Sequence, residues 1–177
     1  VMDSIKRSPN YPWMEESKLA LSDIHGALSQ KEEKFMSSWA ENIPVLGRGV
    51  KASERAYTAF LNKLRADTFN NLLEKYKATG IKLEDDPKFV ADLAKFINNA
   101  TGRGDLNAML GPSGNAAAPL LSGVLFSPRL MASRVNMLNP VTYVKLHPAV
   151  RREAIKSLLS FGAITTTALA LAKAGGA

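Results

Sequence analysis

The sequence contains no cysteine among its 177 residues. Disulfide bonds, thiolate metal sites and thiol redox chemistry are therefore excluded, although a chain without thiols is compatible with any compartment. Histidine is also scarce, because only His25 and His147 occur and neither has a second ligand four residues away. The carboxylates are scattered over the predicted helix faces. We therefore expect no catalytic residues, no metal, no cofactor and no enzymatic activity.

Strand patterns and phosphate-binding loops are missing as well. No stretch alternates between apolar and polar residues over the length of a strand, so we expect no β-sheet. Glycine clusters at 102–104 and 111–114, but neither cluster has the G-x-x-x-x-G-K-[ST] pattern or a preceding strand. We interpret residues 102–126 as a Gly/Pro-rich surface connector that holds one or two helical turns.

What the sequence does contain is helical periodicity, strongest over residues 53–79. Ser53 is suited to the N-cap of this helix and Gly80 to a left-handed C-cap. At 1.5 Å per residue the helix would be about 40 Å long, which is enough to organise shorter helices around it. Its apolar positions are Tyr57, Phe60, Leu61, Leu64, Phe69, Leu72, Leu73 and Tyr76. The predicted fold is therefore all-α, an irregular helical bundle built on this amphipathic helix.

Start and stop signals predict the shorter helices. Residues 1–7 would end one helix before Pro9, Asn10 would cap a second, and the S-x-x-E pattern at 29–32 would open a third that ends near Asn42. A linker at 44–49 would lead into the long helix. Further helices are predicted from Asp86-Pro87 to about Asn99, from Ser127-Pro128 to Leu138, and from Pro148 onward. The chain then divides into a helical region at 1–101, the connector at 102–126, and a basic helical region at 127–177.

Positive charge is concentrated in the C-terminal part. The net charge is +7, and from Arg103 onward eight Lys and Arg stand against Asp105 and Glu153, a net +6. Such a basic surface suits an anionic partner, either nucleic acid or a phospholipid face, with a solvated face as the alternative. The candidate phosphate contacts are Arg129, Arg134, Arg151, Arg152 and Lys156.

The last predicted helix carries no charge over residues 157–172. Sixteen residues span about 24 Å, less than the roughly 30 Å of a bilayer core. We therefore expect this segment to pack against protein, either its own core or a neighbouring copy, with membrane insertion as the alternative. Three threonines at 165–167 weaken the membrane alternative because their hydroxyls need partners. The candidate contact residues are Leu158, Leu159, Phe161, Ile164, Leu169 and Leu171.

Three blocks of the sequence resemble a segment of the large polyvalent proteins of tailed bacteriophages. They read GRGVKASERAYTAFLNKLRADTFNNLLEKY, INNATGRGDL and LFSPRLMASRVNMLNPVTYVKLHPAVRREAIKSLLSFGA. The resemblance extends over most of the chain and carries no catalytic motif. It implies a structural or assembly module of a virion protein, internal to the particle or ejected with the genome. The start at Val1, with no signal-peptide pattern after it, agrees with a segment of a longer polypeptide.

The resemblance also implies a location and partners. We expect the protein in the phage particle, from which it is delivered into the host cell, in contact with other virion proteins or with copies of itself. Two alternatives remain open at this point. One is a nucleic-acid-binding accessory module of a large phage enzyme that contacts phage DNA through its basic part. The other is a segment that contacts a membrane during ejection.

Overall fold

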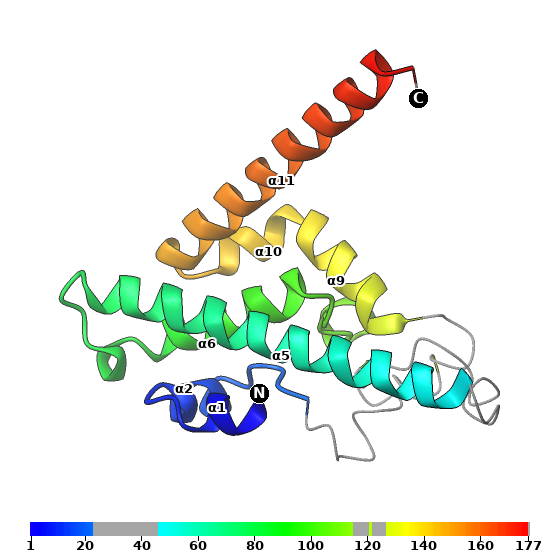
Figure 1. Ribbon diagram of the computed structural model, residues 1–177. Helices are drawn as coiled ribbons and strands as arrows, with labels where there is room; N and C mark the ends of the chain where they lie inside the picture. The colour runs from blue at the N-terminus through cyan, green and yellow to red at the C-terminus, as the bar shows by residue number, and fades with distance from the viewer. Residues whose placement is uncertain (23–45, 115–120, 122–126, 177) are drawn as a thin grey trace.

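The computed structural model describes residues 1–22, 46–114, 121 and 127–176 (Figure 1). Within these ranges there is no strand, which confirms the all-α prediction. The helix predicted from the capping box at 29–32 lies outside the described residues. The helices are α1 (Met2–Lys6), α2 (Tyr11–Glu16), α5 (Leu46–Lys77), the 3-10 turn η1 (Leu83–Asp85), α6 (Pro87–Ala100), α7 (Asn107–Leu110), α9 (Pro128–Leu138), α10 (Pro140–Lys145) and α11 (Pro148–Ala174).

Helix α5 runs along the whole body of the molecule, with α1 and α2 on one side (Figure 1). It begins at Leu46, so the predicted start at Ser53 and most of the predicted linker at 44–49 are wrong. Glycine costs only about 1 kcal/mol in a helix and leaves the backbone hydrogen bonds intact. Gly47 and Gly49 therefore do not prevent the helix from extending toward the N-terminus. The C-terminal prediction is confirmed, because the helix ends at Lys77 and Gly80 has φ +83°.

The core forms where α5, α6 and the start of α11 meet. Asp86 caps α6 by accepting a hydrogen bond of 3.0 Å from the Phe89 N–H, and Pro87 occupies the first turn, as predicted. The predicted apolar face of α6 is buried except for the partly exposed Phe96. It packs against the C-terminal half of α5 and against Val150 and Ala154 of α11. The predicted regions 1–101 and 127–177 therefore share one core.

The apolar face of α5 is buried only in part. Phe69 and Leu73 are fully buried, and Leu61 and Tyr76 nearly so. Tyr57 and Leu64 are exposed, and Phe60 is 62% exposed. Periodicity identifies the face that could be buried, but neighbouring helices decide how much of it is covered. Here α6 reaches only the C-terminal half.

Buried polar side chains attach the N-terminal segment to α5. Asn10 precedes α2 as predicted but does not cap it; its Nδ2 donates to Asn70 Oδ1 and to Glu74 Oε1, each at 3.0 Å. Arg65 is only 1% exposed. Its guanidinium donates to Thr101 Oγ1 and to the Ala20 carbonyl, both at 2.8 Å. Hydrogen bonds of this kind offset the cost of burying a charge.

The stretch after α6 holds one helical turn, α7, and is buried at some positions while Leu110, Pro112 and Ser113 are exposed. Leu106 is fully buried against Ala132 of α9. A Cβ added to Gly104 would lie 2.1 Å from the Ser133 nitrogen, and one added to Gly114 would lie 2.4 Å from the Leu106 oxygen. These glycines are present because the backbones approach closely, which composition alone does not distinguish from a loose linker.

Leu64→Pro tests the continuity of α5. Proline removes a backbone hydrogen bond and clashes with the preceding turn, so we expect a loss of about 3 kcal/mol or more in the free energy of unfolding, measured by urea titration. Leu64→Ala is the matched control, because Leu64 is largely exposed and its truncation should change stability by less than about 1 kcal/mol. Equal stability of the two variants would show that α5 is not continuous at this position.

Candidate functional site

The most unusual feature of the structure is α11, which is anchored to the body only by its first turns. Val150 and Ala154 are buried in the core. An ion pair joins Glu153 to Lys75 of α5. Just before the helix, the His147 N–H donates to Asp92 Oδ2 of α6 at 2.7 Å. These contacts fix the direction in which α11 leaves the body.

Asp86 connects the three elements that meet at this base. Its Oδ2 accepts a 2.5 Å hydrogen bond from the Tyr76 hydroxyl of α5 and lies 3.1 Å from His147 Nε2. The other ring nitrogen of His147, Nδ1, accepts from the Ala149 N–H at 3.3 Å and so caps α11. The Tyr76 and Phe89 rings stack with centroids 3.6 Å apart, and the imidazole contacts both edge-on. One carboxylate thus links α5, α6 and α11.

The electrostatics of this junction favour a charged Asp86 and a neutral Tyr76. Burial raises the pKa of Asp86, but hydrogen bonds from Tyr76 and the Phe89 N–H, with positive charge from His147 when protonated and from Lys88, bring it below its ordinary value. Burial and the adjacent carboxylate raise the pKa of Tyr76 to about 12. At neutral pH Asp86 is therefore ionised and Tyr76 is neutral.

Beyond Ala154 the whole of α11 is exposed. Residues 155–176 are all exposed, and Figure 1 shows the helix projecting away from the body. Leu159 is 68% exposed and Ile164 69%. The predicted contact residues Leu158, Phe161, Leu169 and Leu171 are exposed too. The expectation that this segment packs in the core of its own chain is therefore wrong, because the core ends at Ala154.

The threonines of α11 do not present unpaired hydroxyls. Thr166 Oγ1 donates to the Gly162 carbonyl and Thr167 Oγ1 to the Ala163 carbonyl, both at 2.8 Å. Such bonds to the preceding turn satisfy the hydroxyl inside the helix itself. The threonines therefore disfavour burial of α11 in an apolar environment less than the sequence suggests. By length and composition alone, α11 is also the one helix of the described residues that could cross a membrane.

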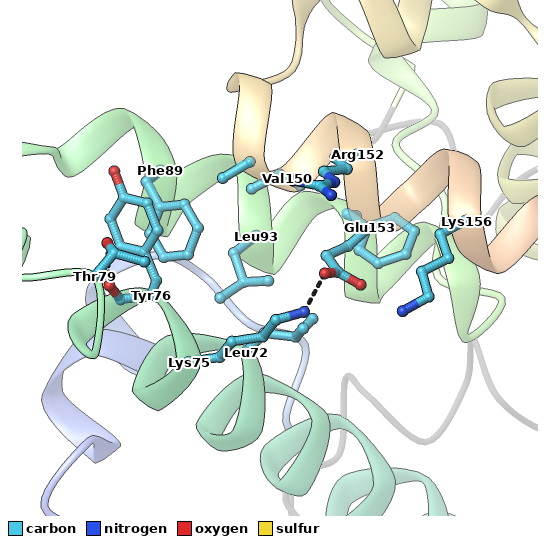
Figure 2. Close-up of a pocket in the computed structure, with 12 residues that line it drawn as sticks. Leu72, Lys75, Tyr76, Thr79, Phe89, Leu93, Val150, Arg152, Glu153 and Lys156 are labelled. Atoms are coloured by element: carbon cyan, nitrogen blue, oxygen red, sulfur yellow. Dashed lines mark hydrogen bonds and ion pairs between the residues drawn. The ribbon is translucent and has the colours of Figure 1, made fainter.

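A cavity of about 420 Å³ lies at the base of α11, between α5, α6 and α11. Its inner wall is apolar, formed by Leu72, Phe89, Leu93, Phe96, Ala149 and Val150. Its charged lining consists of Lys75, Arg152, Glu153 and Lys156. Figure 2 shows Lys75 and Glu153 meeting at the cavity, with Arg152 and Lys156 on the same stretch of α11.

The five predicted phosphate contacts do not gather in one place. Arg152 and Lys156 line the cavity at the base of α11. Arg129 lines a different cavity, bounded by residues 17–22 and by Arg103. Arg134 is exposed on α9, and Arg151 is half-buried on α11. The structure thus brings two of the five together, and their contact with phosphate stays a prediction.

No metal-binding arrangement is found in the described part of the chain. No group of three or more His, Asp or Glu residues there could hold a metal ion. Comparison with known proteins adds no identification: no family model, no curated protein and no solved structure matches the chain. The resemblance to phage polyvalent proteins therefore remains an expectation from the sequence.

Two features of the site have no clear signal in the sequence. The cavity combines side chains from three helices that are far apart along the chain. The Asp86 junction joins Tyr76 to His147 across 71 positions. The sequence marks Asp86 only as a helix cap, because capping is local whereas the other two partners depend on the tertiary packing.

Asp86→Asn tests the charge at the junction. Asparagine caps a helix as well as aspartate does, so the variant removes mainly the charge, and we expect a loss of about 1 to 2 kcal/mol in the free energy of unfolding at pH 7. Because the folded pKa of Asp86 lies below its ordinary value, this stability is present above about pH 4 and is lost as the pH falls through the folded pKa. Urea titrations at pH 7 and pH 3 measure the difference.

The neighbouring exposed carboxylate provides the control for this prediction. Asp85→Asn changes the same charge one residue earlier, at an exposed position of η1, and should leave stability within about 0.5 kcal/mol. If the free energies of unfolding of the parent and of Asp86→Asn differed as much at pH 3 as at pH 7, the stabilising role of the Asp86 charge would be contradicted.

Proposed function

We propose that the protein is a non-catalytic assembly module whose exposed helix α11 is buried against other copies of the chain or against other virion proteins. The observation that carries the proposal is the exposure of residues 155–176 on a helix that has no charge over residues 157–172 and exposes Leu159, Phe161, Ile164, Leu169 and Leu171. A helix of this kind needs to be buried, because exposed apolar patches of this extent mark interaction surfaces. The virion setting rests on the sequence resemblance alone.

The two sides of α11 differ in a way that suits helix association. Small residues recur at Ala163, Thr167, Ala170 and Ala174, a spacing of four, three and four that places them on one face. The opposite side carries Leu158, Phe161 and Leu169. A small face lets a second helix approach closely, and large side chains fill the space around it. Packing between copies would therefore hide both sides.

The proposal predicts that charge on α11 abolishes self-association. With Leu159→Asp and Ile164→Asp together, the protein should become monomeric in sedimentation velocity, while its circular dichroism and melting remain close to those of the parent. The body should stay folded because both positions lie outside the core. Asn71→Asp with Ala91→Asp is the matched control, since it adds two carboxylates at exposed positions of α5 and α6. A parent protein that is monomeric at high concentration would contradict the proposal.

Membrane contact is the second candidate, favoured by the length of α11 and by its internally satisfied threonines. Arg151, Arg152 and Lys156 would lie at the lipid headgroups, and Lys173 would follow the apolar stretch at its other end. The charge-free stretch of 16 residues still measures about 24 Å, short of the roughly 30 Å bilayer core. We therefore rank it below protein burial.

Liposomes separate the two candidates. If α11 contacts protein, the unmodified protein should release little dye from vesicles containing phosphatidylglycerol, and the Leu159→Asp, Ile164→Asp variant should behave in the same way. Efficient leakage that the two substitutions abolish would replace the assembly role with a membrane role. The control pair on α5 and α6 should leave leakage unchanged in either case.

A further inference from the structure

The cavity at the base of α11 has the form of a small-molecule site. Its volume of about 420 Å³ lies within the range of roughly 300–1,000 Å³ that is typical of ligand pockets. Phe89, Leu93 and Val150 contribute apolar wall from residues that are themselves packed in the core. The wall is therefore preformed, because these residues are held by contacts on their other sides.

The charge of the cavity lining is unbalanced. Three cations, Lys75, Arg152 and Lys156, stand against the single carboxylate of Glu153. Glu153 is paired with Lys75. No ion pair of the described residues joins Arg152 or Lys156 to a carboxylate. These two cations remain available to a ligand.

The lowered pKa of Glu153 indicates a positive electrostatic potential at the cavity. The hydrogen bond from Lys75 lowers the pKa of Glu153, and this outweighs the effect of burial, which raises it. The charges of Lys75, Lys156 and Arg152 lower it further. Arg152 and Lys156 form no ion pair with Glu153. Their positive charge would therefore also attract an anionic ligand that lies close to this carboxylate.

We propose that this cavity binds a monomeric amphipathic anion, an apolar chain that ends in a carboxylate, as in a medium-chain fatty acid. The chain lies along the partly exposed Leu72, Phe96 and Ala149, with the buried Phe89 and Leu93 behind them. The head group pairs with Arg152 and Lys156 at the rim. Charge complementarity selects an anion over a cation, and the apolar wall selects a chain over a small inorganic ion. This site is independent of the association proposed for the outer turns of α11.

Decanoate below its micelle concentration is the probe, and the amide shifts of the ¹⁵N-labelled protein are the measurement. We expect saturable shifts at Leu93 and Val150, with little change at Phe161 and Leu169 on the exposed turns. Arg152→Gln with Lys156→Gln should weaken binding about tenfold, since it removes two charge-assisted contacts. Arg134→Gln with Lys173→Gln removes the same charge away from the cavity and should have no effect. Decyltrimethylammonium, with the same chain and the opposite charge, should not bind in the cavity.

A second variant fills the space. Ala149 lines the cavity and is partly exposed, so Ala149→Phe should abolish the decanoate shifts while the protein stays folded. The proposal is overturned if decanoate shifts only the exposed turns or no amide at all, if decyltrimethylammonium binds equally well, or if both charge pairs weaken binding alike. Shifts at the cavity with phosphatidylglycerol vesicles but not with decanoate would also overturn it, in favour of a bilayer surface.

Discussion

The carboxylate of Asp86 is the interaction on which the arrangement of this protein depends. It accepts a hydrogen bond from Tyr76 of α5, caps its own helix α6, and lies 3.1 Å from His147, which caps α11. The neighbouring helices α5 and α6 are thereby joined at one point to α11, which is distant in sequence. Because His147 also donates its backbone N–H to Asp92, the start of α11 has little freedom to turn. The direction of the exposed helix is thus determined by the polar junction at its base, with Val150 and Ala154 supplying the apolar contact.

The contacts between α11 and the body are confined to the base of the helix. Only Val150 and Ala154 of this helix enter the core, and the following turns have no neighbouring helix to cover them. Exposed apolar side chains such as Leu159, Phe161 and Ile164 mark interaction surfaces. In the proposed function the body supports α11, and α11 makes the contact. The cavity lies where support and contact helix meet, so a ligand there would touch both.

Sequence reasoning succeeded where structure is determined locally. Asp86-Pro87, Ser127-Pro128 and Pro148 each mark a helix start within one residue of the observed one, because capping and the fixed φ of proline act over a few residues. It failed at Leu46, since glycine weakens a helix without ending it. Composition does not distinguish the close backbone contacts at Gly104 and Gly114 from a loose loop. The alternative that α11 packs in the core of its own chain is wrong. Its burial against a partner stays a prediction, because periodicity does not specify quaternary contacts.

The candidate site was predictable only in part for the same reason. Composition marked the apolar residues of α11 as candidate contacts, and the structure shows them exposed, so their contact with a partner stays a prediction, as does the predicted phosphate contact of Arg152 and Lys156. Their position beside Phe89 and Leu93 follows from the crossing of α6 and α11. Buried polar groups such as Arg65 gave no signal, because a charged residue on a helix is read as solvent-facing until its partners are known.

Cross-linking through α11 tests the central claim most directly. The chain has no cysteine, so Ala163→Cys introduces a single thiol on the small face, and Ala91→Cys introduces one on the exposed face of α6 as a control. If copies associate through α11, mild oxidation should convert the Ala163→Cys protein largely to a disulfide-linked dimer while the Ala91→Cys protein stays mainly monomeric. Equal and slow cross-linking of the two proteins would contradict association through this helix.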